Sequence, residues 1–206
     1  TKDSLFIYID QFENELAFGI TNNTTLNGSF RKQATKKTVY PVTAAAGITQ
    51  RFTQPKSAPL KDISGTYDVV IQQADGTEEK AVGFSTQEGN RLQASFLRVT
   101  GDSRFLDGVM NGNTFYLSSF IGSGVSYYTG TVNAAGKITG EIVGARGNTA
   151  FTAIENEEAT LPDAYSLTTL KEGYDALSFI FPDADGIPVS LNDPRFKNKV
   201  VILSIT

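Results

Sequence analysis

The stretch Phe105-Leu-Asp-Gly-Val-Met-Asn-Gly-Asn-Thr-Phe-Tyr-Leu-Ser-Ser-Phe120 predicts a β-hairpin. Two runs of strand length, Phe105–Met110 and Thr114–Phe120, lie on either side of Asn111-Gly112-Asn113. Asparagine and glycine tolerate the positive φ angles that tight hairpin turns require. This alternation of short strand and tight turn decides the fold class of the region around it.

The same rhythm continues in both directions from this hairpin. Gly89-Asn90 and Ala135-Gly136 separate further runs of strand length, and Gly147-Asn148 leads into another. Strands that recur about every 8 to 12 residues with short turns favour a sandwich or a small closed barrel. We expect a barrel-like antiparallel meander, because closure removes exposed sheet edges. The expected strands are 65–72, 81–87, 92–99, 105–110, 114–120, 127–132, 138–143 and 150–154.

The first part of the chain also predicts strands. Leu5–Ile9 is a run of β-branched, aromatic and aliphatic residues, and period-2 stretches follow it. We therefore expect a β-rich accessory domain over residues 1–156. This domain could consist of two sub-parts, 1–60 and 61–156. The expected strands before the meander are 5–9, 16–21, 28–31 and 38–43.

The pattern changes after Asn156. Acidic residues form a linker, and Pro162-Asp163 opens a helical pattern with Leu167, Leu170 and Tyr174 on one face and a glycine near its end. We expect a linker and a short helix over residues 157–176.

The last residues predict the opening of a further domain over 177–206. Runs 177–181 and 187–191 on either side of a Pro-Asp-Ala-Asp-Gly turn predict a hairpin. Residues 199–206 do not alternate, which is typical of a strand buried on both faces of an α/β sheet. Nothing follows to cover that strand, so we expect Val200 to Ile205 to pair with another strand, including that of a second copy in a strand-mediated dimer.

Composition excludes several function classes. The sequence contains no cysteine and no histidine, which removes thiolate nucleophiles, disulfides and the commonest metal ligand and general base. We expect no catalytic residue, no cofactor and no metal site. The net charge of -4 argues against a nucleic-acid partner, and no apolar run approaches the roughly 18 residues of a transmembrane segment.

Five residues are candidates for a ligand site or contact surface. Asp102 and Arg104 lie between two expected strands, where they could bind a polar ligand at a barrel mouth or simply stabilise a turn as an ion pair. Tyr116, Tyr127 and Tyr128 could stack on a sugar or an apolar ligand, or pack in the core. Alternation along a strand sends about half of such side chains inward.

The end of the chain resembles a known family. Phe179-Ile-Phe-Pro-Asp-Ala-Asp-Gly-Ile-Pro-Val-Ser-Leu-Asn-Asp-Pro-Arg-Phe-Lys-Asn-Lys-Val-Val-Ile-Leu-Ser-Ile-Thr206 looks like the opening of the thioredoxin-like domain in TlpA and peroxiredoxin-like thiol-disulfide oxidoreductases. Residues 100–108 and 161–174 are similar to the β-rich N-terminal region and connecting helix of such redoxin proteins from Bacteroidetes-type bacteria.

The resemblance implies a location and a role. It implies an exported protein of the bacterial periplasm or cell envelope, with a possible lipoprotein anchor, whose redox motif Trp-Cys-x-x-Cys would follow the last strand. The sequence stops before that motif, so no catalytic residue is carried over. The chain would be a non-catalytic accessory portion that positions the redox domain or contacts client proteins. The alternative is a free-standing calycin-like β-barrel that binds a small apolar or sugar ligand.

Overall fold

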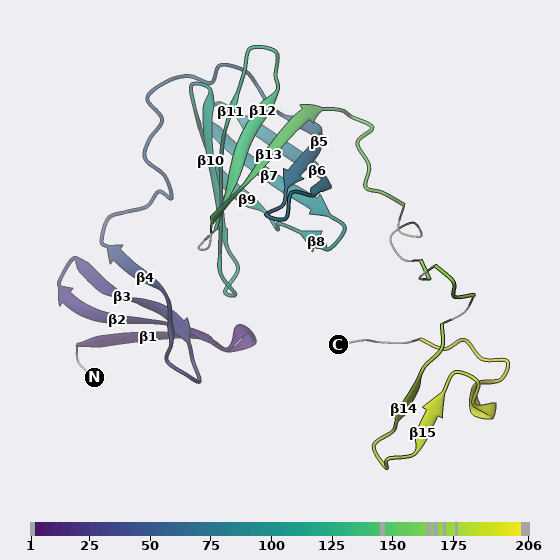
Figure 1. Cartoon of the computed structure of the whole chain (residues 1–206). Helices are drawn as coiled ribbons and strands as arrows, with labels where there is room; N and C mark the ends of the chain where they lie inside the picture. Colours follow the sequence, from purple (N-terminus) through teal and green to yellow (C-terminus); the bar gives the residue numbers. More distant parts are fainter. Residues whose placement is uncertain are drawn as a thin grey trace. The chain divides into compact units, whose positions relative to one another are not determined.

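The computed structural model describes residues 3–144, 147–163, 166, 169–170, 172–175 and 177–202. The described part is mainly β, and its sheets are antiparallel (Figure 1). The chain divides after Pro162 into two compact units, Thr1–Pro162 and Asp163–Thr206, which we describe separately. In the described part of the chain, no helix combines the length and the apolar character needed to cross a lipid bilayer.

The larger sheet of the first unit closes into an eight-stranded barrel (Figure 1). Each strand pairs with its neighbour in the sequence, and β13 pairs with β5 to close the ring. A two-residue strand, β8 (Gly101–Asp102), pairs with the end of β7. The expected barrel is therefore confirmed. Its strands are β5 (Gly65–Gln72), β6 (Glu78–Glu88), β7 (Arg91–Arg98), β9 (Leu106–Asn111), β10 (Thr114–Phe120), β11 (Val125–Val132), β12 (Ile138–Gly144) and β13 (Gly147–Glu155).

The tight turns explain why neighbouring strands pair. Gly112 has φ 62° between β9 and β10, and Gly136 has φ 87° between β11 and β12. Glycine adopts these angles without the steric cost that a Cβ imposes. The hairpin predicted from Phe105 to Phe120 is confirmed, with Phe115 paired to Met110 and Leu117 to Gly108.

Aromatic rings packed against glycines fill the barrel. A Cβ on Gly130 would lie 2.6 Å from Cζ of Phe115, and one on Gly140 would lie 2.6 Å from Cζ of Phe151. The rings therefore occupy space that any other residue at the two glycine positions would need. The buried core consists of Ile63, Tyr67, Val69, Ile71, Ala81, Leu92, Phe96, Leu106, Met110, Phe115, Leu117, Tyr128, Val132, Ile138, Phe151 and Ala153.

The smaller sheet has four strands in sequence order: β1 (Ser4–Ile9), β2 (Asn14–Asn22), β3 (Thr25–Lys32) and β4 (Thr38–Ala45). A single 3₁₀ turn, η1 (Asp10–Phe12), joins β1 to β2. The sheet contacts the β10–β11 loop of the barrel, where Asn14 Nδ2 donates to the Gly122 carbonyl over 2.9 Å. Beside it, the Phe30 and Phe120 rings meet edge to face at 5.6 Å.

The second unit contains a short hairpin. Strands β14 (Ile180–Pro182) and β15 (Pro188–Ser190) pair around the predicted Asp-Ala-Asp-Gly turn, which confirms the hairpin. A 3₁₀ turn, η3 (Pro194–Phe196), follows, and the Asp193 side chain accepts a hydrogen bond from the Arg195 N–H at its start.

The α/β expectation for this unit is not supported. Of the apolar face expected on a helix, Leu167 lies outside the described residues, while Leu170 and Tyr174 are exposed and not helical. The prediction of a helix over residues 157–176 is therefore wrong at the positions that the structure describes. A short helix is stable only when its apolar face is buried against a partner, and these apolar residues are exposed. Val200 and Ile202 are 94% and 90% exposed and form no strand, so the doubly buried strand is also wrong up to Ile202. The remainder of Val200 to Ile205 lies outside the described residues.

Candidate functional site

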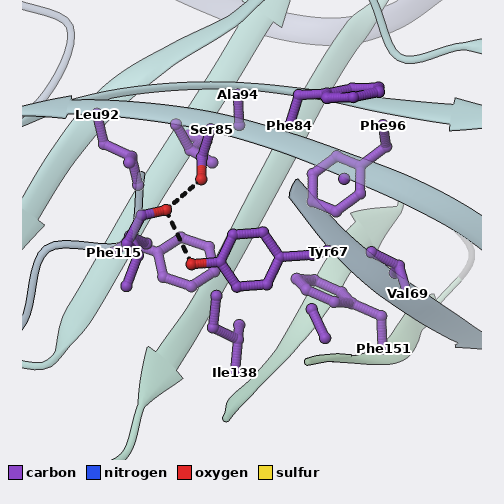
Figure 2. A pocket seen from close by; sticks show the side chains of 14 residues that line it. Tyr67, Val69, Phe84, Ser85, Leu92, Ala94, Phe96, Phe115, Ile138 and Phe151 are labelled. Carbon is purple, nitrogen blue, oxygen red and sulfur yellow. Dashed lines mark hydrogen bonds between the residues drawn. The ribbon is translucent and has the colours of Figure 1, made fainter. Parts of the chain in front are cut away.

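The barrel interior leaves a small cavity (Figure 2). Its volume is about 30 Å³, and Leu92, Phe96, Phe115, Ile138 and Phe151 are among the residues that line it. A single water takes roughly 30 Å³ of liquid, whereas ligand pockets measure about 300 to 1,000 Å³. The filled interior of this structure therefore has no room for a sugar or a lipid-like ligand.

Ile63, which precedes β5, is buried and lines this cavity. Its carbonyl accepts hydrogen bonds from the Tyr67 hydroxyl, over 2.9 Å, and from Ser85 Oγ (Figure 2). Burial and, secondarily, the negative charge of Glu155 raise the pKa of Tyr67 to about 12. Tyr67 therefore stays neutral at ordinary pH and acts as a hydrogen-bond donor.

A half-buried ion pair lies at the opposite end of β5. Arg98 Nε lies 2.7 Å from a Glu79 carboxylate oxygen, and Gln73 donates to the other oxygen over 2.6 Å. The hydrogen bond from Arg98 is the main reason that the pKa of Glu79 lies below its usual range. This pair belongs to the barrel wall and offers no uncompensated charge for chemistry.

Asp102 and Arg104 form an exposed turn. Asp102 Oδ1 accepts the Arg104 backbone N–H over 2.7 Å and lies 3.8 Å from the Arg104 Nε. Asp107, farther along the chain, lies 3.2 Å from the Arg91 guanidinium instead. The two groups of the turn are thus engaged with each other.

The three candidate tyrosines separate onto two faces of the barrel. Tyr128 pairs with Leu117 and points inward, where its ring stacks on Phe96 at 4.9 Å. Tyr116 and Tyr127 point outward, and Phe52 lies between them with its ring centre 6.2 Å from each. The structure therefore joins two of the predicted tyrosines with a phenylalanine that sequence reasoning missed.

Phe52 belongs to an irregular segment between β4 and β5 that crosses the outside of the barrel. Asn111 Oδ1 accepts the backbone N–H groups of Lys56 and Ser57 over 2.9 and 3.0 Å, which fixes the segment. Burial and then the neighbouring Tyr116 raise the pKa of Tyr127. No local pattern marks Phe52, because its position depends on where the segment crosses the barrel. The resulting groove has a volume of about 390 Å³ and is lined by Phe52, Thr53, Gln54, Lys56, Val109, Asn111, Tyr116 and Tyr127.

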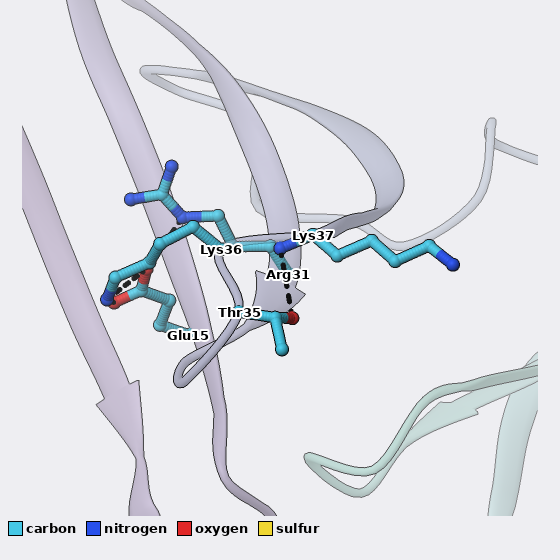
Figure 3. A network of polar contacts seen from close by, with 5 residues as sticks. All are labelled: Glu15, Arg31, Thr35, Lys36 and Lys37. Carbon is cyan, nitrogen blue, oxygen red and sulfur yellow. Dashed lines mark hydrogen bonds and ion pairs between the residues drawn. The ribbon is translucent and has the colours of Figure 1, made fainter.

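A buried carboxylate organises the small sheet (Figure 3). Glu15 is fully buried, and its Oε1 lies 2.6 Å from Arg31 Nε and 3.1 Å from Lys36 Nζ. Burial alone raises the pKa of Glu15, but the hydrogen bonds and charges of Lys36 and Arg31 outweigh it and hold that pKa below its usual range. The carboxylate therefore stays charged and fastens β2 to β3 and to the turn after it.

The first strand of that sheet exposes an apolar surface. Leu5, Phe6, Ile7 and Tyr8 are consecutive and 42% to 56% exposed. The Phe6 and Tyr8 rings stack at 6.5 Å on one face, and the Arg31 guanidinium lies 5.8 Å from the centre of the Phe6 ring. Alternation along the strand places Leu5 and Ile7 on the other face. β1 is thus apolar on both sides.

Within the described residues, no cluster of three or more acidic side chains could hold a metal ion. The described residues offer two surfaces for binding, the aromatic groove and the β1 strand. No protein-family model matches the sequence, and no curated protein or solved structure matches it either.

Proposed function

We propose that this chain is a non-catalytic accessory portion of a bacterial envelope thiol-disulfide oxidoreductase, and that it contacts client proteins. One observation carries the contact role: the barrel is filled, while the sheet beside it exposes an apolar strand, Leu5 to Tyr8. Consecutive exposed apolar residues are typical of surfaces that bind other molecules.

The link to an oxidoreductase rests on the hairpin β14–β15. The Asp183 side chain accepts the backbone N–H groups of Asp185 and Ile187 over 3.0 and 2.9 Å, which stabilises the turn near the start of the family-like segment. The absence of cysteine from the sequence means that dithiol exchange would be performed by another part of the same protein. The accessory portion would then hold a client near that part.

The coding sequence beyond Thr206 tests the oxidoreductase link. We expect a Trp-Cys-x-x-Cys motif shortly after this position. A stop codon, or a long reading frame without a Cys-x-x-Cys motif, would contradict the proposal.

Site-specific cross-linking tests the contact role. A photoreactive residue at Ile7 should cross-link to a reduced, unfolded client polypeptide and only weakly to the same client in its native form. The matched control is a photoreactive residue at Thr139, which is exposed on the barrel wall. Equal cross-linking at both positions would show that the β1 surface has no selective role.

The groove around Phe52 favours a second function, the binding of a short sugar chain. Its aromatic faces can stack on sugar rings, and the Gln54 and Lys56 side chains supply polar groups beside them. Titration of a neutral oligosaccharide should shift the NMR signals of Tyr116 and Tyr127, and Tyr116→Ala should abolish the shifts. Unchanged spectra at millimolar sugar would remove this candidate.

A further inference from the structure

The two free edges of the small sheet differ in how well they can accept another strand. The sheet runs in the order β1-β2-β3-β4, so that β1 and β4 form its edges. Within the described part of the chain, no strand pairs with the outer side of either one. An unprotected edge is a template for strand pairing, and proteins commonly block such edges with proline, charge or bulges.

The hydrogen-bond register shows which backbone groups of β1 face outward. Ile20 N–H donates to the Asp3 carbonyl over 3.0 Å, and the β1–β2 pairing continues from this point without a shift. Antiparallel residues alternate between bonding to one neighbour and to the other. Leu5 and Ile7 therefore bond to β2, while the N–H and C=O groups of Ser4, Phe6 and Tyr8 point to the free edge.

The same reasoning shows that β4 is blocked. Ala46 N–H donates to the Thr24 carbonyl over 2.8 Å, and Phe30 pairs with Tyr40 in the same register. Pro41, next to Tyr40, therefore points its backbone nitrogen to the outer edge, and proline has no N–H to offer there. The proline interrupts the outer edge of β4, whereas β1 has no proline and no charged residue between Ser4 and Ile9.

An aspartate flanks each end of β1. Asp3 precedes the strand, Asp10 follows it, and both are exposed. We propose that β1 binds an extended apolar polypeptide segment with basic residues at its two ends, which adds to the sheet as the next strand. Backbone hydrogen bonds would supply affinity, the apolar side chains on both faces of β1 would contact those of the segment, and the two carboxylates would select its flanks.

This inference rests on the proposed contact with clients, because it names the part of a client that is bound. The test uses the whole chain and three short fluorescent peptides of alternating valine and threonine. One has lysine pairs at both ends, one has glutamate pairs, and one has lysine pairs with a central proline. We expect the chain to bind the first peptide at least about tenfold more tightly than the second or third, because proline removes a strand donor and glutamate repels the two aspartates.

Variants of β1 separate backbone pairing from side-chain contact. Phe6→Pro removes an outward N–H without removing a bond to β2, and it should weaken binding of the lysine-flanked peptide by about tenfold or more. Phe6→Thr is the matched control, since it also removes the ring but keeps the N–H and the strand preference. Asp3→Asn with Asp10→Asn should weaken binding by about fivefold and reduce its dependence on salt. Circular dichroism of each variant checks that the fold is intact.

Three outcomes would overturn the inference. They are equal binding of the peptides with basic and acidic flanks, equal binding by Phe6→Pro and Phe6→Thr, and a dimer in sedimentation experiments that Phe6→Pro dissociates. If the peptides do not bind while an unfolded client still cross-links to the chain, only this inference fails. If neither the peptides nor the client bind, the proposed contact role fails as well.

Discussion

The barrel and the four-stranded sheet are built from the same antiparallel pairing, but only the barrel closes. In the barrel, the pairing of β13 with β5 satisfies both edges, and the inward side chains form one buried cluster. In the sheet, β1 and β4 remain edges, and consecutive residues of β1 are exposed. The barrel thus supplies stability, and the sheet supplies unpaired backbone groups and apolar surface.

This difference teaches where binding is to be sought in the molecule. A closed barrel with about 30 Å³ of free interior has neither an edge nor a ligand chamber to offer. Within the first unit, the outer wall of the barrel and the open sheet are the remaining surfaces. Four substitutions test how far the comparison holds, taken from the largest expected effect to the smallest.

Phe151→Ala should destabilise the barrel strongly. The ring is buried, packs edge to face on Phe96 at 5.5 Å and covers Gly140, so its removal leaves a cavity. We expect a loss of about 3 to 5 kcal/mol in the free energy of unfolding, measured by urea titration. Phe6→Ala in the exposed strand is the matched control and should cost less than about 1 kcal/mol. Similar losses of unfolding free energy in the two variants would mean that Phe6 is as important for packing in the sheet as Phe151 is in the barrel.

Gly130→Ala should destabilise the barrel through overpacking. The added Cβ would lie 2.6 Å from Phe115 Cζ and 2.7 Å from the Thr139 carbonyl oxygen. Such crowding costs about 1 to 3 kcal/mol, and Phe115→Leu in the same chain should recover part of it. Gly124→Ala, whose Cβ would meet nothing within 4 Å, is the control. A neutral Gly130→Ala would show that the ring can move aside.

Glu15→Gln should change how the stability of the small sheet depends on pH. The folded-state pKa of Glu15 lies below its ordinary value of 4.5, so the charged carboxylate stabilises the fold above that pH. This contribution is lost as the pH falls through the folded value. The wild type should therefore lose more stability than Glu15→Gln between neutral pH and acid, measured by urea titration.

The effect of Glu15→Gln at neutral pH should be smaller than that of Gly130→Ala, because Lys36 is 54% exposed and water can solvate its released charge. Glu13→Gln, a change at an exposed neighbour, controls for the loss of one negative charge. Parallel pH profiles for the wild type and Glu15→Gln would contradict the role of the network.

Asp102→Ala should have the smallest effect, within about 0.5 kcal/mol. Arg104 and Asp102 are 68% and 43% exposed, so their ion pair is weak. Arg104→Gly should be neutral or slightly stabilising, since Arg104 has φ 59°, an angle that glycine adopts more readily. A loss above about 1 kcal/mol in thermal or urea unfolding would show that this turn has a structural role.

Much of the β structure could be predicted because its signals are local. The boundaries of β5 and β10 agree with those expected from the strand pattern, and the Asn-Gly-Asn turn led directly to the β9–β10 hairpin. The helix and the last strand could not be predicted in this way. Both Leu170 and Val200 fit an apolar pattern, yet both are exposed in the structure. A periodic pattern indicates which side chains of a segment could be buried. It does not indicate which other element of the fold would pack against them.

The candidate site illustrates the same limit. Tyr127 and Tyr128 are adjacent, and the sequence could say only that they point to opposite faces. The pairing of Tyr128 with Leu117 decided which one enters the core, and the crossing segment decided that Phe52 would lie between Tyr116 and Tyr127.

The sequence by itself determined the short strands, the tight turns and the absence of thiol and imidazole chemistry. These depend on residue type and on contacts between near neighbours. Only the tertiary structure decided that β13 meets β5, that the barrel interior is filled and that β1 is left as an edge. Closure of the barrel depends on the register of all its strand pairs, and filling of its interior depends on the total volume of the inward side chains. Neither quantity can be derived from a single stretch of the sequence.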